Sequence, residues 1–248
     1  MTKYKIHPIV MGTKVFDKSM MTYQFGNGEE YTIPIYCWYI EGGDSKILVD
    51  TGEVRPLQSE ARETAINGKI YTFEAGLDKY GLKPEDIDII IHTHLHNDHC
   101  ENDEKCVNAK IYVHQKEMEH IRDPHPLDFR YNDDFIYEVE ERGQIIELKA
   151  DSEIVSGISV KHTPAHTEGG LSVFIETEKG KVAITGFCII NENLYPPNQI
   201  KAMEMEVIPP GTHINVYEAY QILMQIKGEA DIILPLHEPA FANGEVIG

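Results

Sequence analysis

Residues 89–100, IIIHTHLHNDHC, contain the most informative pattern in the sequence. A run of isoleucine is followed by four histidines and an aspartate within eight positions. The apolar run IDIII at 87–91 is typical of a strand buried on both faces, which implies a sheet that is covered by helices. The polar cluster is therefore expected at the C-terminal end of a buried strand.

The spacing within this cluster is suited to binding metal ions. His94 and His96 lie on the same side of an extended chain, because side chains alternate with a period of two, so both can bind one ion. Asp98 and His99 could address a second position if the chain turns into a loop. Imidazole and carboxylate ligands suit zinc, iron or manganese, and the thiolate-rich spacing of structural zinc sites is absent. His92 precedes this spacing and is expected to pack or to orient a neighbour.

The remaining apolar patterns predict many strands with helices between them. IPIYCWYI at 33–40 and KILVD at 46–50 predict a β-hairpin, joined by the turn-forming EGGDS. Further strands are predicted at 110–114, 145–148, 158–162, 171–176, 181–185 and 231–236, and helices at 71–80, 115–122 and 214–227. The order does not alternate strictly, which favours two sheets with outer helices over one doubly wound sheet. We expect one α+β domain over residues 1–248.

Composition excludes several classes of function. A hydrophobic content of 42% with 25% charged residues is ordinary for a soluble globular protein. The formal charge of -19 repels a phosphate backbone, so nucleic acid is not an expected partner. No signal peptide and no run of about 18 apolar residues occurs, which predicts a cytoplasmic protein without a membrane partner. Four unpatterned cysteines fit reduced thiols in such a compartment.

These motifs together resemble the metallo-β-lactamase superfamily. Its His-x-His-x-Asp-His motif is matched by HTHLHNDH, and ILVDTG, HTPAHTEGGLSVFI and LPLHEP resemble its other metal-site segments. The resemblance implies a first metal held by His94, His96 and His166. It implies a second metal held by Asp98, His99 and His237. Asp50, in ILVDTG, would support these ligands from behind.

The resemblance runs from about residue 33 to residue 238, and within the superfamily the chain looks most like the N-acyl homoserine lactonase group. It implies a four-layer αβ/βα sandwich with the metals at one edge between the sheets. The implied cofactor is one or two Zn²⁺ ions, with iron or manganese as alternatives. The expected partner is a small-molecule substrate, and the sequence makes no prediction of the oligomeric state.

One segment departs from the family pattern. The strand KVAITGFCII offers Phe187 where the family carries an aspartate that bridges the two metals, and Cys188 follows. The site then holds one metal, or two with a weakened second position, or Cys188 binds after a bulge re-aims it. The alternative for Cys188 is a buried apolar thiol. The catalytic tyrosine of the lactonase group would fall at Ile190, and Tyr195 is close enough in sequence to be considered.

The predicted activity is hydrolysis of a lactone or another ester. A bound metal lowers the pKa of its water to about 7, and the resulting hydroxide attacks the carbonyl. Asp98 either shuttles a proton to the leaving alkoxide or is a ligand only. The alternatives are a thioester or phosphodiester hydrolase, or a metal-binding protein that lacks turnover because of Phe187. Loops 53–75 and 191–213 could line an acyl pocket with the following side chains, which could equally be ordinary packing: Tyr71, Phe73, Tyr195, Met203 and Met205.

Overall fold

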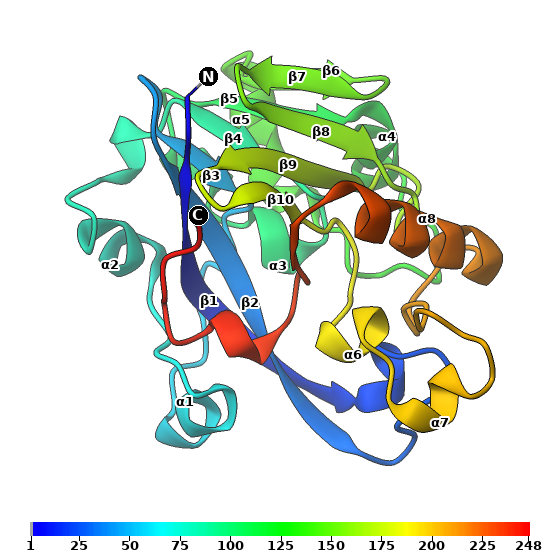
Figure 1. Ribbon diagram of the computed structural model, residues 1–248. Coiled ribbons are helices and arrows are strands. Elements are labelled where there is room, and N and C mark those ends of the chain that lie inside the picture. Colours follow the sequence, from blue (N-terminus) through cyan, green and yellow to red (C-terminus); the bar gives the residue numbers. More distant parts are fainter. Residues whose placement is uncertain (1) are drawn as a thin grey trace.

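The computed structural model describes residues 2–248 and contains two β-sheets (Figure 1). The first sheet is ordered β1 (Lys5–Asp17), β2 (Glu30–Glu41), β3 (Ile47–Val49), β4 (Ile89–Ile91), β5 (Lys110–His114) and β6 (Ile145–Leu148). The second is ordered β11 (Ile232–Leu234), β10 (Gly180–Ile184), β9 (Leu171–Thr177), β8 (Ile158–His162) and β7 (Ser152–Val155). Strands β3 to β6 run parallel, and β1 to β3 are antiparallel. The C-terminal ends of β3 and β4 therefore meet at one edge of the first sheet.

The α-helices of the described chain are α1 (Glu60–Ile66), α2 (Phe73–Asp78), α3 (Asn97–Cys100), α4 (Gln115–Arg122), α5 (Ile136–Glu141), α6 (Asn191–Leu194), α7 (Asn198–Lys201) and α8 (Val216–Glu229). Five short 3-10 helices lie between these elements in the described chain. They are η1 (Lys18–Met20) after β1, η2 (Pro84–Asp86) before β4, η3 (Asp103–Lys105) after α3, η4 (Asp133–Phe135) before α5 and η5 (Pro239–Phe241) near the C-terminus. Among residues 2–248, no helix combines the length and the apolar character needed to cross a membrane.

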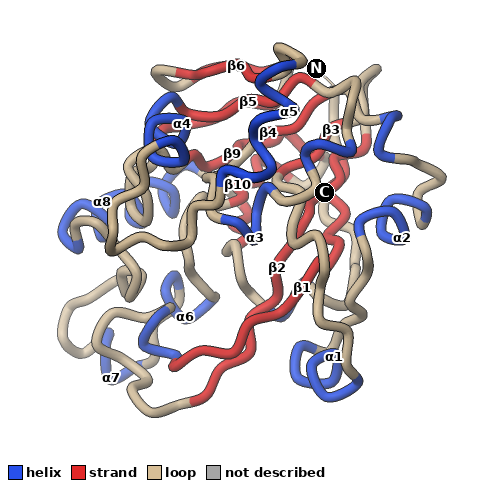
Figure 2. The backbone as a smooth tube through the Cα atoms, turned by 180° about the vertical axis from the view of Figure 1, so that it is seen from behind, coloured by secondary structure: helices blue, strands red, loops and turns tan. Residues whose placement is uncertain are grey.

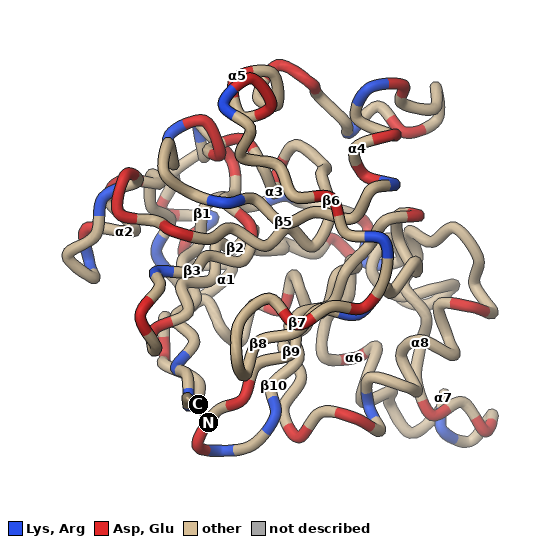
Figure 3. Tube along the Cα trace, turned by 90° about the horizontal axis from the view of Figure 1, so that it is seen from above, with Lys and Arg blue, Asp and Glu red and all other residues tan. Residues whose placement is uncertain are grey.

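Side-chain alternation along the central strands builds two separate cores. Ile89 and Ile91 of β4 face the second sheet and join the core between the sheets, whereas Ile90 faces the opposite way and joins the core under α2, α4 and α5. On the far face of the second sheet, α8 packs Leu223 and Ile226 against Phe174 of β9. The order helix, sheet, sheet, helix is the predicted four-layer αβ/βα sandwich, and Figure 3 shows α4 and α5 outside the first sheet.

The hairpin of β1 and β2 is longer than the other strands and extends beyond the first sheet, where its far end lies beside α6 and α7 (Figures 1 and 2). The Asn193 amide of α6 ties this end down by donating to the carbonyls of Met21 (2.8 Å) and Ile208 (2.9 Å). Ile33 and Ile35 of β2 pack on Ile190 in the same region. This projecting part of the β1–β2 hairpin, the hairpin arm, forms a wall beside the C-terminal ends of β3 and β4.

Every strand predicted from the sequence is present, and so are the three helices, although the helix at 71–80 is shorter than predicted. Strands β1 and β7 and helices α1, α3, α5, α6 and α7 were not predicted. The sequence analysis did not predict β1, because it contains Pro8 and Gly12, and proline and glycine are uncommon inside strands. Pro8 is tolerated since β1 lies at the edge of its sheet, and a register shift occurs between Val10 and Gly12.

Candidate metal centre

The histidine cluster lies where β4 ends and the short helix α3 begins. The turn after β3 lies directly beside it: the Asp50 N–H donates to the Ile91 carbonyl (3.1 Å) and the Thr51 N–H to the His99 carbonyl (2.7 Å). Asp50 adopts the left-handed conformation (φ 57°), which an aspartate tolerates better than most residues. These contacts fix the cluster against the edge of the first sheet.

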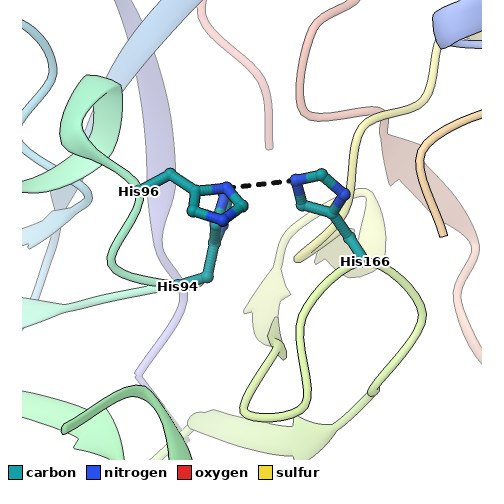
Figure 4. Close-up of side chains that lie close together, drawn as sticks. All are labelled: His94, His96 and His166. Carbon is teal, nitrogen blue, oxygen red and sulfur yellow. Dashed lines mark hydrogen bonds between the residues drawn. The ribbon is translucent and has the colours of Figure 1, made fainter. Parts of the chain in front are cut away.

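Three of the predicted ligands form a first group. The ligand atoms of His94, His96 and His166 all lie within 4.8 Å of one another, and all three side chains are buried. Figure 4 shows the rings turned toward one another, with His94 and His96 from the segment after β4 and His166 from the loop between β8 and β9. The structure thus brings together residues that are 70 positions apart in the sequence.

The other three predicted ligands form a second group. Ligand atoms of Asp98, His99 and His237 lie within 4.8 Å of one another, and these side chains are also buried. Asp98 and His99 are neighbours on α3, so the helical turn, rather than a loop, allows both to face one position. His237 follows β11 in the second sheet. The two groups are in contact, because the ring centroids of His94 and His99 are 4.2 Å apart.

Backbone and hydroxyl contacts fix the tautomers of three histidines. The Nδ1–H of His166 donates to the Thr212 carbonyl (2.9 Å), and that of His237 donates to the Pro34 carbonyl (3.0 Å). The Nδ1 of His94 lies 3.0 Å from the Thr93 hydroxyl, whose proton is already donated to Asp50. Each Nε2 is therefore left as a lone pair, and that of His94 is buried without a hydrogen-bond partner.

Carboxylates fix the other two imidazoles. The Nε2–H of His96 donates to Asp128 (3.2 Å), which leaves its Nδ1 as a lone pair 3.2 Å from the Nε2 of His166. The Nδ1–H of His99 donates to Asp50 (2.8 Å). Two lone pairs facing each other at 3.2 Å repel unless a cation lies between them, so the donor set fits a metal ion.

Burial lowers the pKa of the ligand imidazoles other than His99 and so favours their neutral form. It lowers the pKa of His94 and His166 well below the usual value, helped by the neighbouring imidazoles, and lowers that of His237 to about 4. His99 differs: burial lowers its pKa, but Asp98 and Asp50 outweigh that effect and raise it. Neutral imidazole is the form that binds metals.

Asp50 connects the ligands to the strands behind them. Its carboxylate accepts hydrogen bonds from the Thr93 N–H (2.8 Å), the Thr93 hydroxyl (2.7 Å) and His99. Burial alone would raise the pKa of Asp50, yet His99 and His92 lower it to about 2. His92 is buried as well and lies between Asp50 (3.4 Å) and Asp103 (2.7 Å). Burial disfavours its charge, but Asp103 and Asp50 raise its pKa to about 10, so His92 is an imidazolium that does not face the ligand atoms.

Phe187 and Cys188 point in opposite directions. The strand β10 ends at Ile184, so the period-two pattern does not continue to these residues. Phe187 is 0% exposed and packs under α8 with Ile222 and Leu223, among other side chains. The Cys188 thiol faces the metal centre instead, with its Sγ 3.4 Å from the His166 Nε2. It belongs to neither group of three ligands, and the segment supplies no acid at the centre.

A cavity of about 330 Å³ opens over both ligand groups. Its apolar side comes from the hairpin arm and the loop before η4, and its lining includes Phe16, Met20, Met21, Ile33 and Phe129. The sequence left two possibilities open for the side chains named in loops 53–75 and 191–213, an acyl pocket or ordinary packing, and the cavity lining does not support the pocket. Phe73 is buried in the core under α2, Met203 is 66% exposed, and none of the five lines the cavity.

Polar side chains at the cavity were missed by the sequence analysis. Lys14 of β1 lies 3.1 Å from Asp98 and 3.8 Å from Glu53. Burial would raise the pKa of Asp98, but His99 and Lys14 hold it well below its usual range. Arg130, in the loop between α4 and η4, also lines the cavity. No local pattern marks either cation in the sequence, because each reaches the centre only through tertiary structure.

Comparison with known proteins agrees with this geometry. Residues 31–186 match the metallo-beta-lactamase superfamily. An N-acyl homoserine lactonase from a Bacillus species is 31% identical over 204 residues, which cover 75% of this chain and 76% of that relative. The chain therefore belongs to the metallo-β-lactamase superfamily.

Solved structures agree in fold. An N-acyl homoserine lactone hydrolase with N-hexanoyl-L-homoserine bound at its catalytic metal center matches with a TM-score of 0.73 and 25% identity, over 96% of this chain and 94% of that one. A Bacillus thuringiensis protein with N-decanoyl-L-homoserine bound at its active site matches with the same TM-score, identity and coverage. Because these relatives are hydrolases with a metal center, we class the chain as a metal-dependent hydrolase.

Proposed function

We propose that this chain is a zinc-dependent hydrolase that opens lactones, with an N-acyl homoserine lactone as the first candidate substrate. The observation that carries the proposal is the inward-facing set of neutral imidazole lone pairs at the floor of an accessible cavity. The relatives named above support the choice of a lactone, since two of them bind an N-acyl homoserine. The apolar side of the cavity suits an acyl chain.

We assign six side chains to two metal positions. His94, His96 and His166 would hold one ion, and Asp98, His99 and His237 would hold the other. A set rich in imidazole with a carboxylate fits zinc and disfavours magnesium or calcium, which prefer oxygen ligands. When bound, the metal generates a nucleophile from water at neutral pH and polarises the carbonyl oxygen.

We further propose that Cys188 supplies the negative charge that the missing acid would otherwise bring to this centre. Its sulfur faces the cavity beside His166, and a thiolate is a strong ligand for zinc. Burial raises the pKa of this thiol to about 12, so it is protonated at neutral pH until a metal displaces the proton. The alternative is a centre that holds its metals through the six other side chains alone.

Asp98 is proposed to be a metal ligand first and a proton carrier second. Its lowered pKa makes it a weak base, so it would pass a proton on to the leaving oxygen rather than retain it. Lys14, at 3.1 Å, would hold the carboxylate in place.

The test is a hydrolysis screen with the zinc-loaded protein. N-hexanoyl homoserine lactone, an acyl thioester and a phosphodiester are supplied to the wild type, to Asp98→Asn and to the control Asp44→Asn, whose carboxyl is exposed and lies outside the cavity. We expect lactone opening by the wild type and the control, and a loss of at least about 100-fold in Asp98→Asn. Hydrolysis of the phosphodiester or thioester without lactone opening would replace the proposed substrate. A fully metallated protein that is inactive on all three would be a metal-binding protein.

A further inference from the structure

Lactone opening is faster when a hydrogen-bond donor stabilises the oxygen on which negative charge develops, and none of the described residues that line the cavity is a tyrosine. The donor that the lactonase resemblance implies falls at Ile190, which is buried among Met21, Ile33 and Ile35. Tyr195 is 60% exposed and lies outside the cavity lining. Such a donor is worth about 10²–10³ in rate where it has been removed from other enzymes, so its position matters.

Apart from the ligand histidines and Cys188, four side chains at the cavity carry hydrogen-bond donors: Lys14, Asn97, Arg130 and Thr212. Lys14 is already paired with Asp98 and lies near Glu53. Asn97 and Thr212 are neutral, and neutral donors form weaker hydrogen bonds to a developing anion than a charged donor does. Arg130 is the cation at the side of the first ligand group, with its Nη1 3.4 Å from the Nε2 of His166.

Two anchors hold Arg130 in place. Its Nε–H donates to Asp128 (2.6 Å), and the same carboxylate accepts the Nε2–H of His96 (3.2 Å). Its backbone carbonyl accepts the N–H of Asn97 (2.9 Å) at the start of α3. The next residue, Tyr131, packs its ring against His96 at 4.7 Å. The loop that carries Arg130 is therefore attached directly to the metal motif.

These anchors leave part of the guanidinium unused. Asp128 occupies only the Nε–H, while the Nη1 group points at a lone pair that a metal ion would take over. The side chain is 34% exposed and lines both the central cavity and an adjoining hollow, so a ligand in the cavity can reach it. Hydrogen bonding to Asp128 raises the pKa of Arg130 against the effect of burial, and the group remains a cation.

We propose that Arg130 is a further catalytic residue, which donates hydrogen bonds from its Nη groups to the ester oxygens of the substrate. This role rests on the proposed lactone hydrolysis. In that reaction the oxygen of water forms a bond to the carbonyl carbon, the ring C–O bond breaks, and the ring oxygen leaves as an alkoxide that takes up the proton lost by the water. Arg130 stabilises the negative oxygen and transfers no proton, because its pKa is too high for that exchange.

The test compares wild type with Arg130→Met, which keeps the length of the side chain and removes its charge. Arg122→Met is the matched control, since Arg122 is exposed on α4 and pairs with Glu140 outside the cavity. We expect Arg130→Met to lose about 10²–10³ in kcat on N-hexanoyl homoserine lactone, with bound zinc unchanged. The loss should be smaller on a p-nitrophenyl ester, whose leaving group needs less stabilisation. Full kcat in Arg130→Met, or a loss of zinc together with kcat, would overturn the proposal.

A binding measurement separates this proposal from the proposed function. Calorimetric titration of the zinc-loaded proteins with ring-opened N-hexanoyl-L-homoserine should give a Kd at least about tenfold weaker in Arg130→Met than in the wild type and the control, as expected for loss of a charge-assisted hydrogen bond. If the wild type opens no lactone, the proposed function fails, whereas the titration separately shows whether Arg130 donates to a ligand in the cavity. Equal affinities in wild type and variant, or no binding by the wild type, would overturn it.

Discussion

Replacing Asp50 by asparagine should weaken both the fold and the metal centre. Asparagine tolerates the left-handed conformation of Asp50 and has the same shape, so the change removes charge with little backbone strain. On one side the carboxylate accepts the Thr93 N–H, and on the other side it accepts the Thr93 hydroxyl and His99. The new NH₂ group faces a donor whichever way the amide is turned, so at least one buried hydrogen bond is lost.

The size of the effect follows from burial. Asp50 and His92 are both 0% exposed, and because His92 keeps its closer partner Asp103, the expected cost is that of a buried hydrogen bond left unsatisfied, about 1–3 kcal/mol. Loss of the contact that orients a metal-binding imidazole typically lowers metal affinity about 10–100-fold. We therefore expect both losses in Asp50→Asn, through His92 for the fold and through His99 for the second metal position.

The assay is urea unfolding of the metal-free protein, combined with zinc competition against a chelator. Asp44→Asn removes an exposed carboxylate and should change neither quantity. An Asp50→Asn variant that unfolds at the wild-type urea concentration and binds zinc with wild-type affinity would refute the reasoning that Asp50 holds the centre together.

Three further predictions concern Cys188, its neighbour and the turn after β3. Because the Cys188 thiol is protonated at neutral pH, zinc binding should release one more proton from wild type than from Cys188→Ser, measured by calorimetry in buffers of different ionisation enthalpy; equal release would show that the thiol does not bind zinc. Phe187→Asp should not restore a bridging acid, because it removes a core side chain at a cost of at least about 3–5 kcal/mol. Cys188→Asp should instead stay folded and place a carboxylate at the centre. Urea unfolding and zinc content distinguish the two variants. Gly52→Ala should destabilise the protein by about 1–3 kcal/mol, because φ is +71° and the new Cβ would lie 2.3 Å from the Met11 Cβ. The control Gly143→Ala, at φ +67° in open space, should lower the melting temperature less. Equal decreases in melting temperature would contradict this expectation.

The central strands and the local half of the centre could be predicted because their signals are short-range. The IDIII run and the His-x-His-x-Asp-His spacing lie within 13 consecutive residues, and one turn of α3 brings Asp98 and His99 to the same position. His166 and His237 carry no such signal, and only resemblance to the superfamily indicated them. They form hydrogen bonds with the carbonyls of Thr212 and Pro34, which lie far from them in the sequence.

The errors have a common physical origin. The apolar wall of the cavity comes from the β1–β2 hairpin, and β1 was not predicted because Pro8 and Gly12 are unusual in a strand, so no residue of this wall was considered for the pocket. Lys14 lies on that same strand. The direction of the Cys188 side chain could not be predicted from the alternation of side chains along a strand, because β10 ends four residues before it. Tertiary packing determines the side-chain directions there. Arg130 lies in a loop without a periodic pattern, where sequence alone gives no direction to a side chain.

The proposed function depends on the assignment of two groups of three side chains to two metal ions. Its most direct test is the zinc content of metal-free protein that has been loaded with zinc and freed of excess metal, measured by mass spectrometry for wild type, His94→Ala and His237→Ala. We expect two zinc ions per wild-type chain and about one in each variant, because each substitution removes a ligand from one group only. One ion or none in the wild type, or two ions in both variants, would contradict it.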